Sequence, residues 1–123
     1  MIAAVTASLQ AAPVLAADPI QGRKIVENRA KSACLLCHSG PFPAPHSQGN
    51  IGPRLDGMGD RLTQRELRMR LVNPAGSNPD TIMPSYGVAA NLNRTGIQWQ
   101  GKSILSEEEI DDVVAFLASL RDP

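Results

Sequence analysis

Two cysteines and a histidine stand close together in the first third of the chain, in the order Cys34-Leu35-Leu36-Cys37-His38. One helical turn spans about 3.6 residues, so the two thiols face nearly the same side and can both reach one flat ligand. This C-x-x-C-H pattern is the attachment signature of a c-type haem, in which the thiols add to the porphyrin vinyl groups and the histidine binds the iron. The sequence therefore predicts one covalently bound haem c, held by Cys34, Cys37 and His38.

The same residues could serve three other kinds of site. A thioredoxin-like redox pair would lie in an alternation of strands and helices, and the sequence shows no run of β-branched strands. A zinc site could add His46 to Cys34, Cys37 and His38, but structural zinc sites usually have two spaced ligand pairs. A plain disulfide would leave the adjacent histidine without a role. Haem attachment explains all three residues and uses both cysteines of the chain.

A methionine thioether is a suitable second axial ligand, because it is soft and raises the reduction potential relative to two nitrogen ligands. The chain has four methionines. Met1 belongs to a segment that we expect to be removed, Met58 lies close to the first site in sequence, and Met69 is expected to pack in the middle of a helix. Met83, which directly precedes Pro84 in an irregular segment, is the predicted ligand. Core packing is the other interpretation of Met83.

Residues 40–59 are rich in glycine, proline and asparagine, so we expect a long loop that wraps one edge of the porphyrin. Within it, Pro53 has a carbonyl but no N–H that could compete as a donor. If that carbonyl meets the second ring nitrogen of His38, it fixes the tautomer and orientation of the ligand. An ordinary turn proline is equally consistent with the sequence. His46, in the same loop, is expected to be exposed.

Helices should position these groups. Asp18-Pro19 is typical of a helix start, and we expect a mixed apolar stripe to run from Ile20 to the attachment motif. Two capping boxes predict two further helix starts, one from Thr63 with Glu66 and one from Ser106 with Glu109. The last helix has the clearest apolar face, formed by Ile110, Val113, Val114, Leu117 and Leu120.

The predicted fold class is all-α, with the N- and C-terminal helices crossing around a covalently bound haem and with long loops between them. Residues 85–105 suggest a small hairpin or a loop over the haem, with Trp99 either against the porphyrin or simply packed. Only 3% of the 123 residues are aromatic. A buried porphyrin would supply the missing apolar bulk of so small a domain.

Basic and acidic residues balance at 12 each, so the net charge gives no reason to expect nucleic acid or an anionic membrane as a partner. Arginines gather in residues 54–70 and acids in 107–112. Each cluster is either a solvated face or a docking surface for a redox partner. Residues 1–17 carry no charge and end in small residues, which predicts a cleaved secretory leader, a cytochrome c domain over 18–123 and no membrane span in the mature protein.

The order of motifs resembles the class I cytochrome c fold: an attachment motif near the N-terminus, a Gly-Pro-x-Leu loop, a Met-Pro segment and a C-terminal amphipathic helix. The residues of four individual segments resemble the SoxX family, the small monohaem subunits of the SoxAX cytochromes of thiosulfate oxidation. The segments that carry this resemblance are GRKIVENRAKSACLLCHSG, GNIGPRLDGMGDR, NPDTIMPSYG and GKSILSEEEIDDVVAFLASL.

The resemblance implies that Cys34 and Cys37 hold the haem, that His38 and Met83 are its axial ligands, and that the protein is a periplasmic electron-transfer subunit. It also implies a heterodimer with a larger SoxA-type dihaem or monohaem cytochrome, on which thiosulfate is joined to a carrier-protein cysteine. This chain would then be the non-catalytic subunit of an L-cysteine S-thiosulfotransferase and would pass electrons to a downstream acceptor. The alternatives are a free monohaem cytochrome c that shuttles electrons to a terminal oxidase, and a peroxidase with a vacant axial position.

Overall fold

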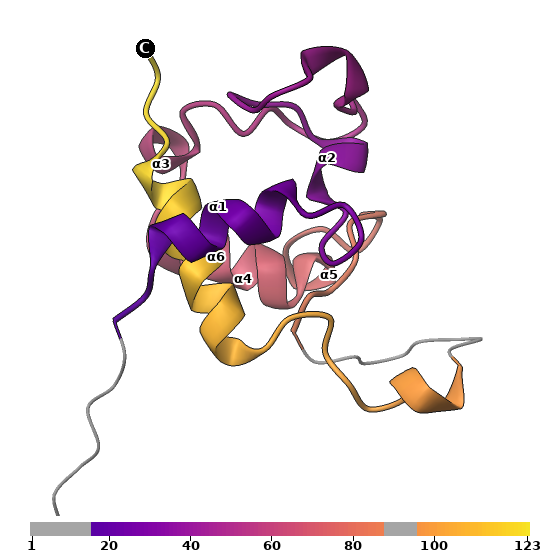
Figure 1. Ribbon diagram of the computed structural model, residues 1–123. Coiled ribbons are helices and arrows are strands. Elements are labelled where there is room, and N and C mark those ends of the chain that lie inside the picture. The colour runs from indigo at the N-terminus through magenta and orange to yellow at the C-terminus, as the bar shows by residue number, and fades with distance from the viewer. Residues whose placement is uncertain (1–15, 88–95) are drawn as a thin grey trace, which may run out of the picture.

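The computed structural model describes residues 16–87 and 96–123, and within them the chain forms helices joined by loops, with no strand (Figure 1). The helices, in chain order, are α1 (Pro19–Glu27), α2 (Cys34–Cys37), the 3₁₀ turn η1 (Pro45–Ser47), α3 (Met58–Arg61), α4 (Gln64–Val72), α5 (Pro74–Ser77), the 3₁₀ turn η2 (Ile97–Trp99) and α6 (Glu107–Ser119). The predicted all-α class is confirmed.

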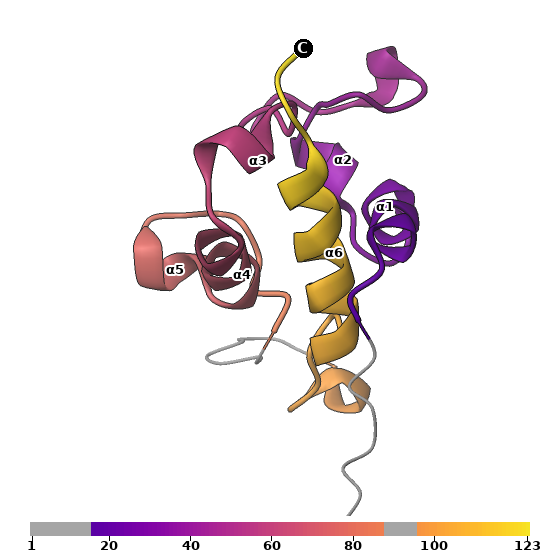
Figure 2. The ribbon, with the colours of Figure 1, turned by 90° about the vertical axis from the view of Figure 1, so that its left-hand side faces the viewer.

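Helices α1 and α6 cross in close contact, as Figures 1 and 2 show. The contact point is Gly22, where a Cβ atom would lie 2.0 Å from the backbone oxygen of Asp112. Only a glycine lets the two backbones approach this closely. The side chain of Asp112 also accepts a hydrogen bond from the backbone N–H of Asp18 at 2.6 Å. The predicted crossing of the terminal helices is thus present and is fixed by a glycine.

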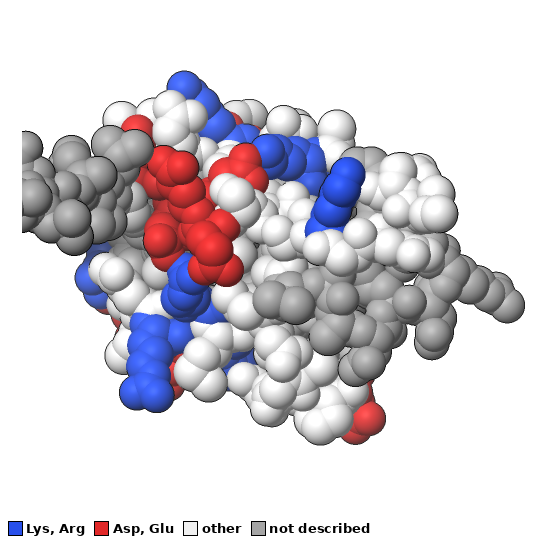
Figure 3. Space-filling view, turned by 90° about the horizontal axis from the view of Figure 1, so that it is seen from below, with Lys and Arg blue, Asp and Glu red and all other residues white. Residues whose placement is uncertain are grey.

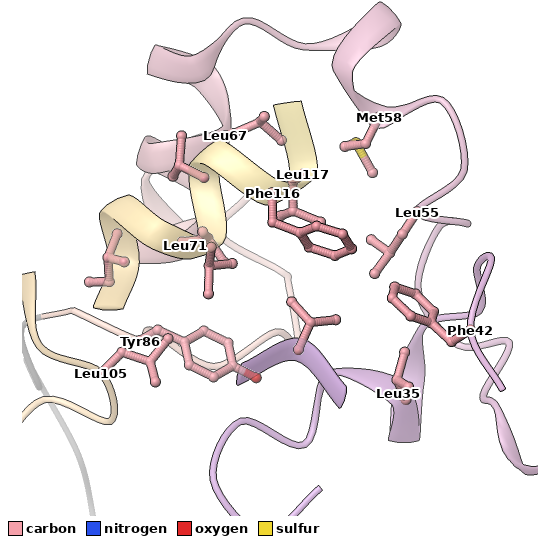
Figure 4. Close-up of a cluster of buried hydrophobic side chains, with 14 residues drawn as sticks. Leu35, Phe42, Leu55, Met58, Leu67, Leu71, Tyr86, Leu105, Phe116 and Leu117 are labelled. Atoms are coloured by element: carbon pink, nitrogen blue, oxygen red, sulfur yellow. The ribbon is translucent and has the colours of Figure 1, made fainter. Parts of the chain in front are cut away.

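The core lies between α6 and the segments that surround it (Figure 4). Helix α6 contributes its whole apolar face, of which Ile110 is 0% exposed, and α4 contributes Leu67 and Leu71. The long loop before α3 adds Phe42 and Leu55. Burial of such side chains stabilises the fold by about 1.5–3 kcal/mol each. Loop residues therefore share the core with the helices that the sequence predicted.

The local helix signals are confirmed. The side chain of Asp18 accepts a hydrogen bond from the N–H of Ile20, with Pro19 at the first helical position. Both capping boxes form, with the side chain of Thr63 paired to Glu66 before α4 and that of Ser106 paired to Glu109 before α6. Each box supplies partners for N–H groups that a helix start leaves free.

Two packing predictions are wrong. The apolar stripe of the first helix does not run into the attachment motif, because α1 ends at Glu27 and the side chain of Asn28 accepts hydrogen bonds from the N–H groups of Ala30 and Lys31. An asparagine that bonds to the backbone in this way favours a turn over a helix. Ile20 is 66% exposed instead of packed. Met69 also faces outward and is 51% exposed, because α4 turns Leu67 and Leu71 toward the core.

The basic and acidic clusters partly pair with each other. Arg68 on α4 forms ion pairs with Glu107 and Asp111 on α6, and Lys31 pairs with Glu109. Figure 3 shows this face of the molecule, where acidic side chains gather beside basic ones. Part of the charge pattern therefore joins two helices, which neither interpretation of the clusters had included.

Within residues 16–87 and 96–123, no helix is long and apolar enough to cross a membrane. The prediction of a cleaved leader falls mostly outside the described residues, which begin at Ala16. The same holds for much of the segment predicted as a hairpin or loop and for the side chain of Trp99.

Candidate haem site

The attachment motif forms a single helical turn. Ala33, which precedes it, adopts a left-handed backbone conformation with φ 56°, and the N–H of His38 donates to the carbonyl of Cys34 at 2.9 Å. Both cysteines are partly buried and carry free thiols. The turn therefore carries both thiols, with two residues between them, and His38 directly follows the second.

The ring of His38 is held by the backbone of the long loop. Its Nδ1 atom lies 2.6 Å from the carbonyl oxygen of Pro53. A carbonyl can only accept a hydrogen bond, so Nδ1 is the donor, and in the neutral ring Nε2 then keeps its lone pair. The contact that the sequence suggested for Pro53 is present, and it leaves His38 in the tautomer that can bind a metal through Nε2.

Gly52 lies directly against this ring. A Cβ atom at this position would be 2.5 Å from Cε1 and 2.6 Å from Nδ1 of His38, so no larger residue fits without moving the imidazole. Glycine thus allows the loop to approach the ring closely. The sequence analysis had not assigned a role to Gly52, although its place before Pro53 is the signal that could have indicated one.

The rest of this loop runs alongside the attachment turn. Backbone N–H groups of Gly49, Gly52 and Leu55 donate to the carbonyls of residues 35, 37 and 39, at 2.9, 2.7 and 2.8 Å respectively. At Gly49 the two backbones come so close that a Cβ atom would lie 2.1 Å from the carbonyl oxygen of Leu36. The loop and the turn therefore form one hydrogen-bonded unit around His38.

Met83 lies on a different segment, between α5 and Tyr86. It is half-buried and packs against the core cluster, and its N–H donates to the side-chain oxygen of Thr81 at 3.1 Å. Met58 is buried in the core with 8% exposure. The structure thus brings Cys34, Cys37, His38 and Pro53 together and places the predicted second ligand on a separate, core-packed segment.

His46 is exposed in η1, as expected. Among residues 16–87 and 96–123, no group of three His, Cys, Asp or Glu side chains is arranged to hold a metal ion. The four residues considered for zinc are all in this part of the chain, so the zinc alternative has no support in the geometry.

A buried tyrosine lies beside the first cysteine, and sequence analysis did not identify it. The hydroxyl of Tyr86 donates to the carbonyl of Ser32 at 2.5 Å. Burial raises the pKa of the Cys34 thiol, while hydrogen bonds with Ser32 and Tyr86 lower it by less. Burial is also the main reason why the pKa of Tyr86 lies well above its ordinary value, so its hydroxyl keeps its hydrogen at neutral pH.

These residues fit a c-type haem. Two thiols stand on one helical turn, and the imidazole of the next residue donates from Nδ1 to a backbone carbonyl, which leaves Nε2 available. Metal-binding histidines usually donate their other ring N–H in this way. The Cytochrome c family matches residues 20–121 of the chain. The chain belongs to the cytochrome c family. Membership of this family implies covalently bound haem c.

This cytochrome c is also similar to a solved structure, described as the crystal structure of SoxXA from P. pantotrophus. The similarity covers 97% of this chain and 90% of that chain, with 35% sequence identity and a TM-score of 0.76. A comparison with curated proteins gave no match. The similarity confirms the resemblance to the SoxX family that the motifs indicated.

Proposed function

We propose that this cytochrome c is the small electron-transfer subunit of a SoxAX-type complex and accepts electrons released when thiosulfate is joined to a carrier-protein cysteine. The observation that carries the proposal is the similarity to SoxXA over nearly the whole chain. At 35% identity and this coverage, the likeness includes the loops around the attachment motif as well as the helices.

One haem would be bound through thioether bonds to Cys34 and Cys37, with His38 and Met83 as axial ligands. When bound, the haem supplies a one-electron redox centre. The chain's own residues then have distinct tasks. Pro53 holds His38 in the tautomer that exposes Nε2, Gly52 leaves room for the ring, and the core around Met83 keeps that side chain in place. With both axial positions filled, electron transfer needs no substrate at the iron.

The partner would be a larger SoxA-type cytochrome with one or two haems, and the sulfur chemistry would take place there. Both cysteines of this chain are used for attachment, so it retains no thiol for a sulfur intermediate. Such a complex would work in the periplasm, after removal of residues 1–17 as a leader, and would deliver electrons to a downstream acceptor.

The axial ligand can be tested with Met83→Ala, using Met69→Ala as the matched control, because Met69 is an exposed methionine on the outside of α4. Loss of the thioether should lower the reduction potential and let added imidazole or cyanide bind the iron. The control should behave as the unchanged protein does. Equal potentials in all three proteins would show that Met83 is not the ligand.

The partner can be tested by purifying the native protein from periplasm, washing with salt and staining every remaining polypeptide for haem. A second, larger haem polypeptide at equal stoichiometry is the expected result, because an obligate interface survives salt whereas a transient electrostatic contact does not. A single haem band at the mass of this chain would instead favour a free shuttle to a terminal oxidase.

A further inference from the structure

Tyr86 is the sole tyrosine of the chain and is 4% exposed, within the buried cluster shown in Figure 4. Its hydroxyl donates to the carbonyl of Ser32, 54 positions earlier in the chain. Its backbone N–H donates to the carbonyl of Leu71 at 2.8 Å, and its own carbonyl accepts from the N–H of Leu105 at 3.0 Å. Tyr86 is therefore hydrogen-bonded to three separate parts of the chain: α4, the residue just before the cap of α6, and the segment before α2.

The acceptor of the tyrosine hydroxyl belongs to a fixed part of the structure. Ser32 is 3% exposed, and its side-chain hydroxyl donates to the carbonyl of Ile25 at 2.7 Å, which ties it to α1. It lies two residues before Cys34. A hydrogen bond to the Ser32 carbonyl is thus a bond to the base of the attachment turn.

The donor belongs to the segment that carries Met83, three residues before Tyr86. The other hydrogen bonds of this segment are local: the N–H of Thr81 donates to the carbonyl of Asn78, and that of Met83 donates to the side chain of Thr81. Among the described residues 78–87, Tyr86 makes the hydrogen bonds that reach distant parts of the chain. Besides the packing of Met83 on the core, the hydrogen bond of the Tyr86 hydroxyl is therefore what joins this segment to the residues just before α2.

We infer that Tyr86 is a positioning residue: its hydroxyl holds the Met83 segment against the attachment turn and so keeps the methionine sulfur on the iron bound by His38. The inference rests on the proposed function, because it takes Met83 as the second ligand. Removing the hydroxyl leaves the buried carbonyl of Ser32 without this donor, and an unsatisfied buried polar group is costly. Detachment of Met83, which frees the segment to relax, then becomes easier.

The test compares the haem-loaded Tyr86→Phe variant with the unchanged protein, since phenylalanine keeps the ring and removes only the hydroxyl. Imidazole is titrated against the ferric protein, and the far-red absorption band of the methionine–ferric iron bond is followed. We expect Tyr86→Phe to bind imidazole about 5- to 30-fold more tightly, the size that corresponds to one lost buried hydrogen bond. The control is Ser119→Ala, which removes a hydroxyl-to-carbonyl hydrogen bond to Phe116 at the end of α6 and should change the imidazole affinity less than twofold.

An affinity of Tyr86→Phe within twofold of the unchanged protein, whose far-red band is present, would overturn the positioning role and leave the ligand assignment intact. Absence of that band from the unchanged protein would instead refute Met83 as the ligand, and the inference with it. If Tyr86→Phe yields no haem-loaded protein, 3-fluorotyrosine is incorporated at this sole tyrosine position. Its more acidic phenol is a stronger donor, so imidazole affinity should fall, and an equal or higher affinity would contradict the inference.

Discussion

The close approach of Gly52 to His38 allows one substitution to be worked through quantitatively. In Gly52→Ala, the new methyl group would lie 2.5 Å from Cε1 and 2.6 Å from Nδ1 of the ring, whereas ordinary van der Waals contact begins at 3.4 Å. The ring or the loop must therefore move by about 1 Å, which interiors as dense as those of proteins do not absorb freely. Such a shift also disrupts the 2.6 Å hydrogen bond between His38 and Pro53.

The expected loss follows from two contributions. Overpacking of this kind costs about 1–3 kcal/mol, and the lost hydrogen bond costs about 1 kcal/mol more. We therefore expect the free energy of unfolding of the haem-loaded protein to fall by about 2–4 kcal/mol in a guanidinium titration. The dependence of that free energy on denaturant concentration should stay the same. The reduction potential should rise, because an imidazole without the carbonyl partner is a weaker donor to ferric iron.

Gly76→Ala provides the matched control, since the nearest atom to a Cβ there is the flexible side chain of Asn73 at 3.2 Å. It lies in α5, where alanine is favoured over glycine by about 0.5–1 kcal/mol, so its stability should change by less than about 1 kcal/mol. If Gly52→Ala unfolds at the same denaturant concentration as Gly76→Ala and keeps its reduction potential, the packing argument for the His38 ring is wrong.

Three further substitutions test other contacts. Gly22→Ala places a methyl group 2.0 Å from the backbone oxygen of Asp112, where the obstacle is backbone and cannot move aside as a side chain could. The free energy of unfolding should therefore fall by about 3 kcal/mol or more. Unchanged stability in a denaturant titration would refute the close contact of α1 with α6. Ser106→Ala removes the acceptor for the N–H of Glu109 and should cost about 1 kcal/mol in the same titration, with Ser77→Ala, where no cap is made, as the control. Hydrogen bonds from Arg121 and the N–H of Asp122 lower the pKa of Asp60 below its ordinary value of 3.8. The carboxylate therefore stabilises the fold above that pH and loses this effect as pH falls through the lower folded value. As the pH is lowered from about 4, the Asp60→Asn variant should lose less stability than the unchanged protein. If the urea midpoints of the two proteins fall by equal amounts over that pH range, the prediction is wrong.

The sequence predicted those features that depend on neighbouring residues. The caps at Asp18, Thr63 and Ser106 are local, because each side chain bonds to a backbone group two or three positions away. The attachment motif is local for the same reason. The contact between His38 and Pro53 spans 15 positions, and it could be suggested because proline offers a carbonyl without a competing donor.

Features that depend on distant residues could not be predicted in this way. The apolar stripe of the first helix was wrong because Asn28 ends α1 and because α6 packs on Gly22, not on Ile20. The pairing of Arg68 with Glu107 and Asp111 requires α4 and α6 to be side by side. No periodicity in a single segment carries that information.

The contact of α1 with α6 has a consequence for how the protein is made. The partner atoms of Gly22 and Asp18 belong to Asp112, and the hydrogen bond between Asp18 and Asp112 joins residues 94 positions apart. Synthesis proceeds from the N-terminus, so α1 lacks its main packing partner, α6, until nearly the entire polypeptide has emerged. The attachment turn is complete long before that moment. The residues of the attachment turn are therefore present before the terminal helices can meet, and the packing of α6 on α1 closes the domain last.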